Sequence, residues 1–502
     1  MQVFQIVIAL LLGGALLAAL ARRMAMPYPA LVAIAGAALS LLPGVPSLAF
    51  DPELALALFV APVLLDAAFD ASQRDLRRNW GSVVSLALGA VVLTVGVVAL
   101  VAHTLVPGLP WAVALALGAI VAPPDAAAAT AVLKQLRPPH RLLVILEGES
   151  LFNDASALLI YRFAVAAAVA AHVVSVPSFA GTLILVSVGS VALAWVLART
   201  VAYVNVRIHD VATAVIVQFC TTFAVWLLAE RLHLSGILTM VVFAMLVSRL
   251  AVTPARIRLP SYAVWEVAVF VLNVLAFILV GFQLRQIVVR TDWTDYIGVA
   301  AAVCGAVVVA RIVWVMGAAA FNRCRCRDTS PDLIALSGRA AAIVGWCGMR
   351  GTVTLAAALA LPEAFPYRDL VFFTSFAVVL VTLVVQGMTL RPLLAWLDVR
   401  DDGTVEREVQ LARVESLRAA LEAVAECEGG ETAELLRRRY DLRLRRAEEN
   451  GNELSADDAA VIRVATNAER RRLLDLRSDG TIGDAAFQQV EQELDIKELD
   501  LL

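Results

Sequence analysis

Charged residues are scarce in this sequence of 502 residues. They make up 17% of the chain, whereas soluble globular proteins carry about 25%. Hydrophobic residues make up 60%, and the mean hydropathy is +0.80. These values exclude an ordinary soluble protein and indicate a polytopic membrane protein.

Two further features are lacking. The six cysteines show no spacing typical of zinc ligands, so we interpret Cys324 and Cys326 in "NRCRCRD" as ordinary thiols beside membrane-proximal arginines. The N-terminus has neither a charged n-region nor a small-residue cleavage site. Residues 1–21 are therefore predicted to form the first membrane span rather than a signal peptide.

Apolar segments of roughly 20 residues recur along the chain and predict about thirteen transmembrane helices. The predicted spans are 2–21, 27–43, 52–70, 80–105, 111–134, 141–172, 178–200, 211–230, 234–251, 262–284, 296–320, 332–361 and 369–397. Arg-rich loops such as "QRDLRRN" (73–79) alternate with Arg-poor ones. By the positive-inside rule, the N-terminus is predicted to lie outside and the C-terminus in the cytoplasm.

The composition changes after residue 400. Residues 401–502 are rich in Glu, Asp and Arg, and "LARVESLRAALEAV" (411–424) has apolar residues at helical spacing. We interpret this stretch as a soluble helical cytoplasmic domain with a regulatory role. Its acidic and basic residues are interspersed, which favours a solvated helical face over a basic patch for lipid headgroups.

A pair of prolines interrupts one predicted span, "GAIVAPPDAAAATAVL" (118–133). Pro123 and Pro124 must break or unwind the helix, because proline lacks a backbone donor and clashes with the preceding turn. Unwound backbone at membrane depth is tolerated only where it lines a cavity or is buried in protein. Freed carbonyls beside Asp125 suit a monovalent cation. The alternative is a proline kink next to a buried, neutral Asp125.

The stretch "GESLFNDASALL" places polar side chains inside another span. On a helix, Glu149 and Asn153 share one face, and Ser150 and Asp154 share the next. Together they can meet Asp125 from the neighbouring span. A charge at the bilayer centre costs about 2.5–3.5 kcal/mol, so such groups must be paired, neutral or hydrated. The alternative is polar contacts that hold helices together, which explain the two carboxylates poorly.

A second interrupted span, "GRAAAIVGWCGMRGTVTLAAALALP" (338–362), lies seven spans after the first. It carries Gly345, Gly348 and Gly351, with Arg350 in mid-span. Paired Gly/Pro-interrupted segments in matching halves are typical of inverted-repeat transporters. Close helix packing would also explain the glycines, but the arginine cannot lose its charge and needs a partner.

A looser set of polar residues also falls in or near predicted spans: Arg311, Asp66, Asp70 and Gln386. Arg311 is deep enough to require a carboxylate partner. Asp66 is predicted to lie within the membrane and Asp70 at its edge. Structural ion pairing is the favoured role for this set.

These stretches resemble the motifs of monovalent cation:proton antiporters of the bacterial sodium/proton exchanger group. "EGESLFNDASAL" is similar to the family's GES-L-x-ND signature, "GMRGTVTLAAALALP" to its Arg-Gly helix, and "APVLLDAAFDASQRDLRRNW" to its third-span motif. The likeness covers about residues 1–400. It implies an all-α fold with inverted repeats and broken crossing helices. A core bundle would comprise about 80–172 and 296–397, and a dimerisation part about 1–70 and 178–284.

The resemblance implies roles for the polar residues. The family's ion-binding aspartate falls on Asp154, preceded by Asn153, and its broken-helix aspartate falls on Asp125. Ser150 and a backbone carbonyl near Pro124 would complete the shell of a sodium ion held at Asp154 and Asp125. Many members have Thr where this chain has Pro124, which removes one hydroxyl oxygen from the expected shell.

The resemblance also implies structural charge pairs. Arg350 and Arg311 fall on the arginines that the family pairs with buried acids. Glu149 is expected to pair with an arginine or to orient Asn153. Asp66 stands where members usually carry Glu, so its side chain is one methylene shorter.

The implied activity is exchange of a monovalent cation for H⁺ by alternating access, with Na⁺ preferred over K⁺ or Li⁺ and no cofactor. In that family an Asn-Asp pair accompanies electroneutral exchange, and the non-titrating Asn153 agrees with this. A homodimer in the cell inner (plasma) membrane is implied. The expected partners are the cation, the proton and the lipid bilayer, with no nucleic acid.

Two other classes remain open. An intramembrane aspartyl protease would need Asp125 and Asp154 to share one site, but it does not predict Asn153 or Arg350, and the usual protease motifs are absent. A channel or sensor with a signalling tail is the other class. A flux assay separates them, because an antiporter shows saturable counter-transport and a channel shows conductance.

Overall fold

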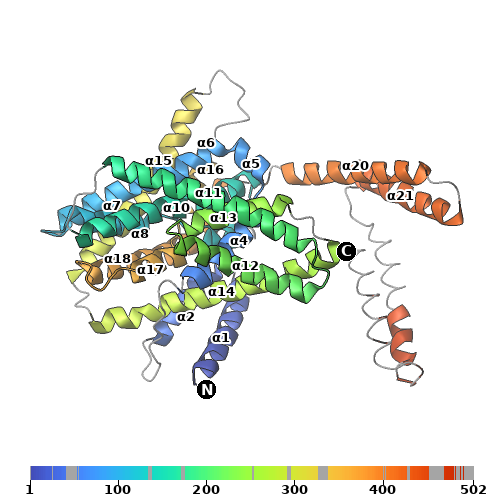
Figure 1. Ribbon diagram of the computed structural model, residues 1–502, viewed down its shortest axis with the longest axis horizontal. Coiled ribbons are helices and arrows are strands. Elements are labelled where there is room, and N and C mark those ends of the chain that lie inside the picture. The colour runs from blue at the N-terminus through green and yellow to red at the C-terminus, as the bar shows by residue number, and fades with distance from the viewer. Residues whose placement is uncertain are drawn as a thin grey trace. The chain divides into compact units, whose positions relative to one another are not determined.

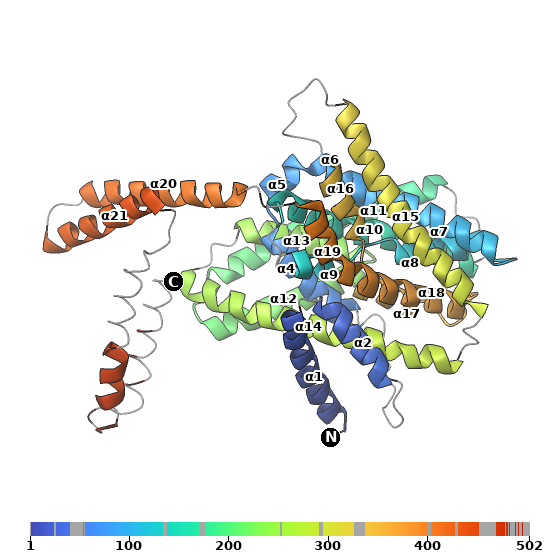
Figure 2. The same cartoon turned by 180° about the vertical axis from the view of Figure 1, so that it is seen from behind.

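The computed structural model describes most of the chain, and every regular element in its described residues is helical (Figures 1 and 2). The main described ranges are 2–24, 27–40, 56–133, 138–170, 176–250, 254–290, 295–325, 337–399, 403–426, 430–450 and 468–476. The chain divides into two compact units, Met1–Asp402 and Gly403–Leu502. The thiols of Cys324 and Cys326 and the first residues of the predicted span 332–361 lie outside what is described.

The first unit is built from membrane-length helices. Among the described residues, seven helices are long and apolar enough to cross a membrane, and three shorter apolar helices accompany them. The elements up to the middle of the unit are α1 (Gln2–Met24), α2 (Tyr28–Ser40), η1 (Leu56–Val60), α4 (Ala61–Asp70), α5 (Gln73–Arg78), α6 (Trp80–Val84), η2 (Ser85–Ala90), α7 (Val91–Leu105), α8 (Trp111–Val121), α9 (Ala126–Leu133) and α10 (His140–Ala170). The remaining elements are α11 (Val176–Asn205), α12 (Val211–Arg231), α13 (Gly236–Leu250), α14 (Ala255–Arg290), α15 (Ile297–Arg325), α16 (Gly338–Trp346), α17 (Thr352–Leu359), α18 (Arg368–Val381), η5 (Thr382–Gln386) and α19 (Gly387–Leu397). The protein is thus an all-α polytopic membrane protein, and its elements follow the predicted spans closely.

Helix α14 differs most from its predicted span. It begins at Ala255 rather than at residue 262 and contains Pro260. The sequence favoured a loop there, because arginines and a proline normally mark the end of a helix. In the structure Arg256, Arg258 and Pro260 are exposed and Ile257 is buried. This one-sided burial suits a helix that extends beyond the bilayer.

Three short π-helical turns interrupt the spans: η1, η2 and η5. The sequence did not predict them, because a π turn has no distinct composition. Such turns change the hydrogen-bond register and occur frequently at functional sites. Both η2 and η5 supply contacts to the polar interior described below.

The helix that carries the signature stretch, α10, lies at the centre of the packing. Its buried apolar residues belong to three separate clusters, through Ile145, Leu151 and Ala157. Two clusters also contain residues of α15 and α18, and the third contains residues of α4, α11 and α13. Helix α10 thus joins two groups of helices. Their assignment to a core bundle and a dimerisation part stays a prediction.

The second unit contains the helices α20 (Thr404–Glu426) and α21 (Glu431–Asn450), which pack against each other. Its ion pairs are exposed, as between Arg418 and both Glu415 and Glu448. Exposed pairs of this kind contribute about 0–1 kcal/mol each. The solvated helical faces expected from the sequence are therefore present here.

Candidate functional site

The two interrupted spans meet at their breaks. Helix α8 ends at Val121 and α9 begins at Ala126, while α16 ends at Trp346 and α17 begins at Thr352. Between these ends the backbone is not helical, and the Asp125 N–H donates to the Met349 carbonyl at 2.6 Å. Backbone groups released by one break are thus satisfied by the other, as a membrane interior requires.

Arg350 ties the two breaks together. Its Nε donates to the Val121 carbonyl at 2.7 Å, its Nη2 to the Ala122 carbonyl at 3.1 Å, and its Nη1 to the Gly348 carbonyl. A carboxylate was the expected partner, and this expectation is corrected: carbonyls at the end of α8 take that place. The last carbonyls of a helix lack intrahelical donors and carry partial negative charge, so they suit a guanidinium.

Glycine is required where the breaks touch. A Cβ added to Gly351 would overlap the carboxylate of Asp125. A Cβ added to Gly348 would likewise collide with the Arg311 side chain. The glycines of this span therefore allow close approach of polar side chains, beyond the helix packing that they were equally expected to serve.

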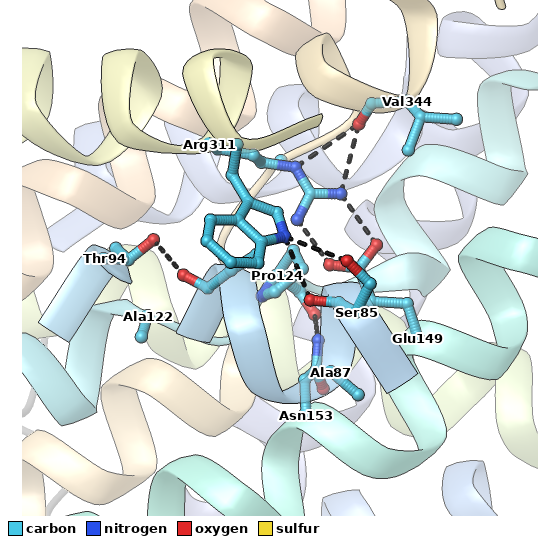
Figure 3. Close-up of polar contacts among 12 residues, drawn as sticks. Ser85, Ala87, Thr94, Ala122, Pro124, Glu149, Asn153, Arg311 and Val344 are labelled. Atoms are coloured by element: carbon cyan, nitrogen blue, oxygen red, sulfur yellow. Dashed lines mark hydrogen bonds and ion pairs between the residues drawn. The ribbon is translucent and has the colours of Figure 1, made fainter. Parts of the chain in front are cut away.

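Glu149 on α10 forms a buried ion pair with Arg311 on α15 (Figure 3). The distances are 2.5 Å from Nη1 to Oε1 and 2.9 Å from Nη2 to Oε2, and the two side chains are 3% and 1% exposed. The same guanidinium donates to the Val344 carbonyl at 3.1 Å. The structure thus gives Arg311 the carboxylate partner that its depth demanded.

Asn153 and Asp154 lie one turn further along α10 and face the proline break. Both are buried, with Asp154 5% exposed. The Asn153 Nδ2 donates to the Pro124 carbonyl at 3.4 Å (Figure 3). The Asn153 Oδ1 has no donor among the described residues. Asp125 and Glu149 are close enough to act electrostatically on Asp154, so the predicted ion-site residues do converge.

Sequence reasoning missed several residues that support this site. Ser156 Oγ donates to the Ala87 carbonyl of η2 at 2.7 Å, and Trp314 Nε1 donates to the Ser85 carbonyl at 3.0 Å. Thr382 in η5 accepts the backbone N–H of Arg350 at 3.0 Å. Hydroxyls in the middle of apolar spans were the available signal.

The remaining predicted residues lie as follows. Ser150 is half-buried on α10, one turn before Asp154. Asp66 is half-buried and Asp70 exposed on α4, and their pairing stays a prediction. Gln386 is buried, and neither atom of its amide has a partner within the described part of the chain.

The arrangement can hold either a cation or a proton. Asp154 supplies a carboxylate, Asn153 an unpartnered amide oxygen and Pro124 a carbonyl, all in a buried setting. Oxygen ligands of these kinds suit hard monovalent cations at broken helices. A single buried carboxylate makes cation and proton compete, because each neutralises the same charge.

Comparisons with known proteins agree with this chemistry. A protein of Mycobacterium bovis named an uncharacterized Na⁺/H⁺ exchanger is 29% identical, over 99% of this chain and 96% of its own. The sodium, potassium, lithium and rubidium/H⁺ antiporter of Bacillus subtilis is 30% identical, over 68% of this chain and 53% of its own.

The fold is similar to that of the sodium proton antiporter MjNhaP1 of Methanocaldococcus jannaschii. The TM-score is 0.61 at 17% identity, covering 77% of this chain and 99% of the other. Residues 6–396 match the family described as sodium/hydrogen exchanger, transmembrane. With both broken helices and the signature helix inside that range, the chain belongs to the sodium/hydrogen exchanger family.

Proposed function

We propose that this protein exchanges a monovalent cation for H⁺ by alternating access, with Asp154 as the shared binding group. Na⁺ is the expected preference, with K⁺ and Li⁺ as further substrates, since a Bacillus subtilis relative is named for sodium, potassium, lithium and rubidium. The family consists of transporters, which argues against the aspartyl protease alternative. A channel would not need a carboxylate for which cation and proton compete.

The observation that carries the proposal is the availability of Asp154. Both buried arginines are engaged elsewhere, Arg311 by Glu149 and Arg350 by backbone carbonyls. Within the described residues, no donor contacts the Asp154 carboxylate, although it is buried. A buried ionised carboxylate without a partner is costly, so it must take up a cation or a proton.

Asp125 and Ser150 complete the proposed shell. The backbone of Asp125 is fixed by its hydrogen bond to Met349, and its carboxylate lies against Gly351. Ser150 lies one helical turn from Asp154. Asp66 is proposed to act in structural ion pairing, as are Glu149 and Arg311.

Exchange is expected to be electroneutral, because Asn153 cannot titrate and leaves Asp154 as the only exchanging carboxylate. In sealed proteoliposomes with an internal pH dye, Na⁺, Li⁺ and K⁺ gradients should drive proton movement. The rate should be the same with the membrane potential clamped at zero or at negative values. Steady current in the reconstituted protein would contradict this stoichiometry, and conductance without counter-transport would favour the channel.

Gly351→Ala is expected to slow exchange, because the added Cβ displaces the Asp125 carboxylate. Misplacement of a working group by about 1 Å can cost about 100-fold in rate, so we expect a loss of about 10- to 100-fold. Gly96→Ala is the matched control, since a Cβ there meets nothing within 4 Å. A Gly351→Ala protein that exchanges at the wild-type rate would argue against a working role for Asp125.

We further propose a homodimer in the cell inner membrane, with the N-terminus outside. The unit 403–502 would then lie in the cytoplasm and regulate transport. The Arg-rich loops and the positive-inside rule support this orientation. Cysteine labelling from either side of intact cells tests it.

A further inference from the structure

A second hollow lies in the first unit, lined by other residues than the ion site. Its volume is about 540 Å³, within the range of small-molecule pockets. It lies between the segment from α5 to α7 and the last turns of α15. Trp314 lines it on one side, and the proposed function does not use it.

The hollow lies at one membrane boundary. Its lining includes residues at the start of the span Trp80–Leu105, at the start of His140–Val169 and at the end of Ile297–Asn322. Three span ends meet only where the helices leave the bilayer on the same side. The adjoining loop is Arg-rich, so this is the side proposed to face the cytoplasm.

The lining is polar at one end and apolar along its walls. Arg78, Asn79, Arg141 and Asn322 supply the polar groups. The Arg141 Nε donates to Asn79 Oδ1 at 2.8 Å, which fixes that guanidinium at the edge of the hollow. Arg78 is exposed on α5, beside Asn79.

The apolar wall opens toward the bilayer. Val313 and Phe321 are 59% and 64% exposed on α15, and both line the hollow. A Cβ on Gly317 between them would meet nothing within 4 Å, so the space beside this helix is open. An occupant must therefore combine an anionic head with a hydrocarbon chain.

We propose that this hollow binds an anionic phospholipid of the bilayer. Its phosphate lies between Arg78 and Arg141, with Asn79 and Asn322 as further donors, and one acyl chain follows α15 past Gly317. Arginine is well suited to phosphate because its guanidinium can donate two parallel hydrogen bonds. Clustered basic groups at the cytoplasmic end of transmembrane helices attract anionic headgroups.

The site adjoins the transport machinery through Trp314. Its indole donates to Ser85 in η2, and the same turn accepts the hydroxyl of Ser156 through the Ala87 carbonyl. Ser156 follows Asp154 by two residues on α10. A bound lipid would thus support the helices that position Asp154, although its binding does not depend on the proposed exchange.

The test uses the full chain, purified in detergent and delipidated. Phosphatidylglycerol, phosphatidylcholine or inorganic phosphate is added, and bound lipid is counted by native mass spectrometry alongside thermal unfolding. We expect phosphatidylglycerol alone to bind and to raise the unfolding temperature. Replacing Arg78 or Arg141 by Ala should weaken its binding about fivefold each, the effect of about 1 kcal/mol per basic residue.

Gly317→Phe fills the hollow without removing charge, and it should also abolish phosphatidylglycerol binding. Arg77→Ala and Gly305→Phe are the matched controls, since neither residue lines the hollow and a Cβ at Gly305 meets open space. Equal binding of phosphatidylcholine, or undiminished binding by Gly317→Phe, would overturn the proposal. A stabilisation reproduced by inorganic phosphate alone would overturn it as well, in favour of a free-phosphate site.

Discussion

Asp154→Asn is expected to reduce exchange to the rate of protein-free liposomes while the protein remains folded. The substitution keeps the size and shape of the side chain but removes the group that binds both proton and cation. Asp154 is buried and has no donor among the described residues. Removing its charge therefore breaks no ion pair, and the thermal unfolding temperature should be equal to or above that of the wild type.

The measurement compares wild type and variant in sealed proteoliposomes with an internal pH dye under an imposed Na⁺ gradient. Asp369→Asn is the matched control, because Asp369 is an exposed aspartate in the first turn of α18. It should exchange at the wild-type rate. If the Asp154 variant exchanged as fast as the wild type, Asp154 could not be the shared site.

Glu149→Gln is expected to lower the free energy of unfolding by about 3–5 kcal/mol, because it leaves Arg311 buried without its counter-charge. The guanidinium would keep only its bonds to the Val344 carbonyl. The loss should appear in equilibrium unfolding of the detergent-solubilised protein. It should exceed the loss for Glu415→Gln, which breaks an exposed pair worth about 0–1 kcal/mol.

A double variant separates the charge from the packing. Glu149→Met combined with Arg311→Met removes both charges and keeps most of the side-chain volume. Buried ion pairs replaced by apolar residues are often no less stable, so the double variant should recover most of the loss. A double variant as unstable as Glu149→Gln alone would show that the pair does more than balance charge.

The sequence was most informative where one residue type has a fixed requirement. Pro123 and Pro124 cannot continue a helix, and the structure ends α8 at Val121. Arg311 must have a partner in a membrane, and Glu149 provides it. Both inferences rest on the chemistry of single side chains, which does not depend on how distant segments cross.

Geometry between distant segments could not be predicted from local patterns. Arg350 was known to need a partner, but its carbonyl acceptors lie 228 and 229 residues away on the other broken helix. A carbonyl is available at every position, so composition does not reveal which one is accepting. The same holds for Thr382 and Ser156, whose roles depend on π turns that have no sequence signature.

The carbonyl partners of Arg350 have an electrical consequence. Two arginines, Arg311 and Arg350, hold positive charge at the crossing, and the carboxylates of Glu149 and Asp125 would offset them if both are ionised. Asp154 then decides the total: the moving assembly is neutral when Asp154 carries a proton or a monovalent cation and singly negative when Asp154 is empty. A low-dielectric interior strongly disfavours the passage of net charge, so only the loaded forms would cross. Coupling between the two ions would then come from the charge of the whole assembly, and a divalent ion would be rejected for leaving it positive.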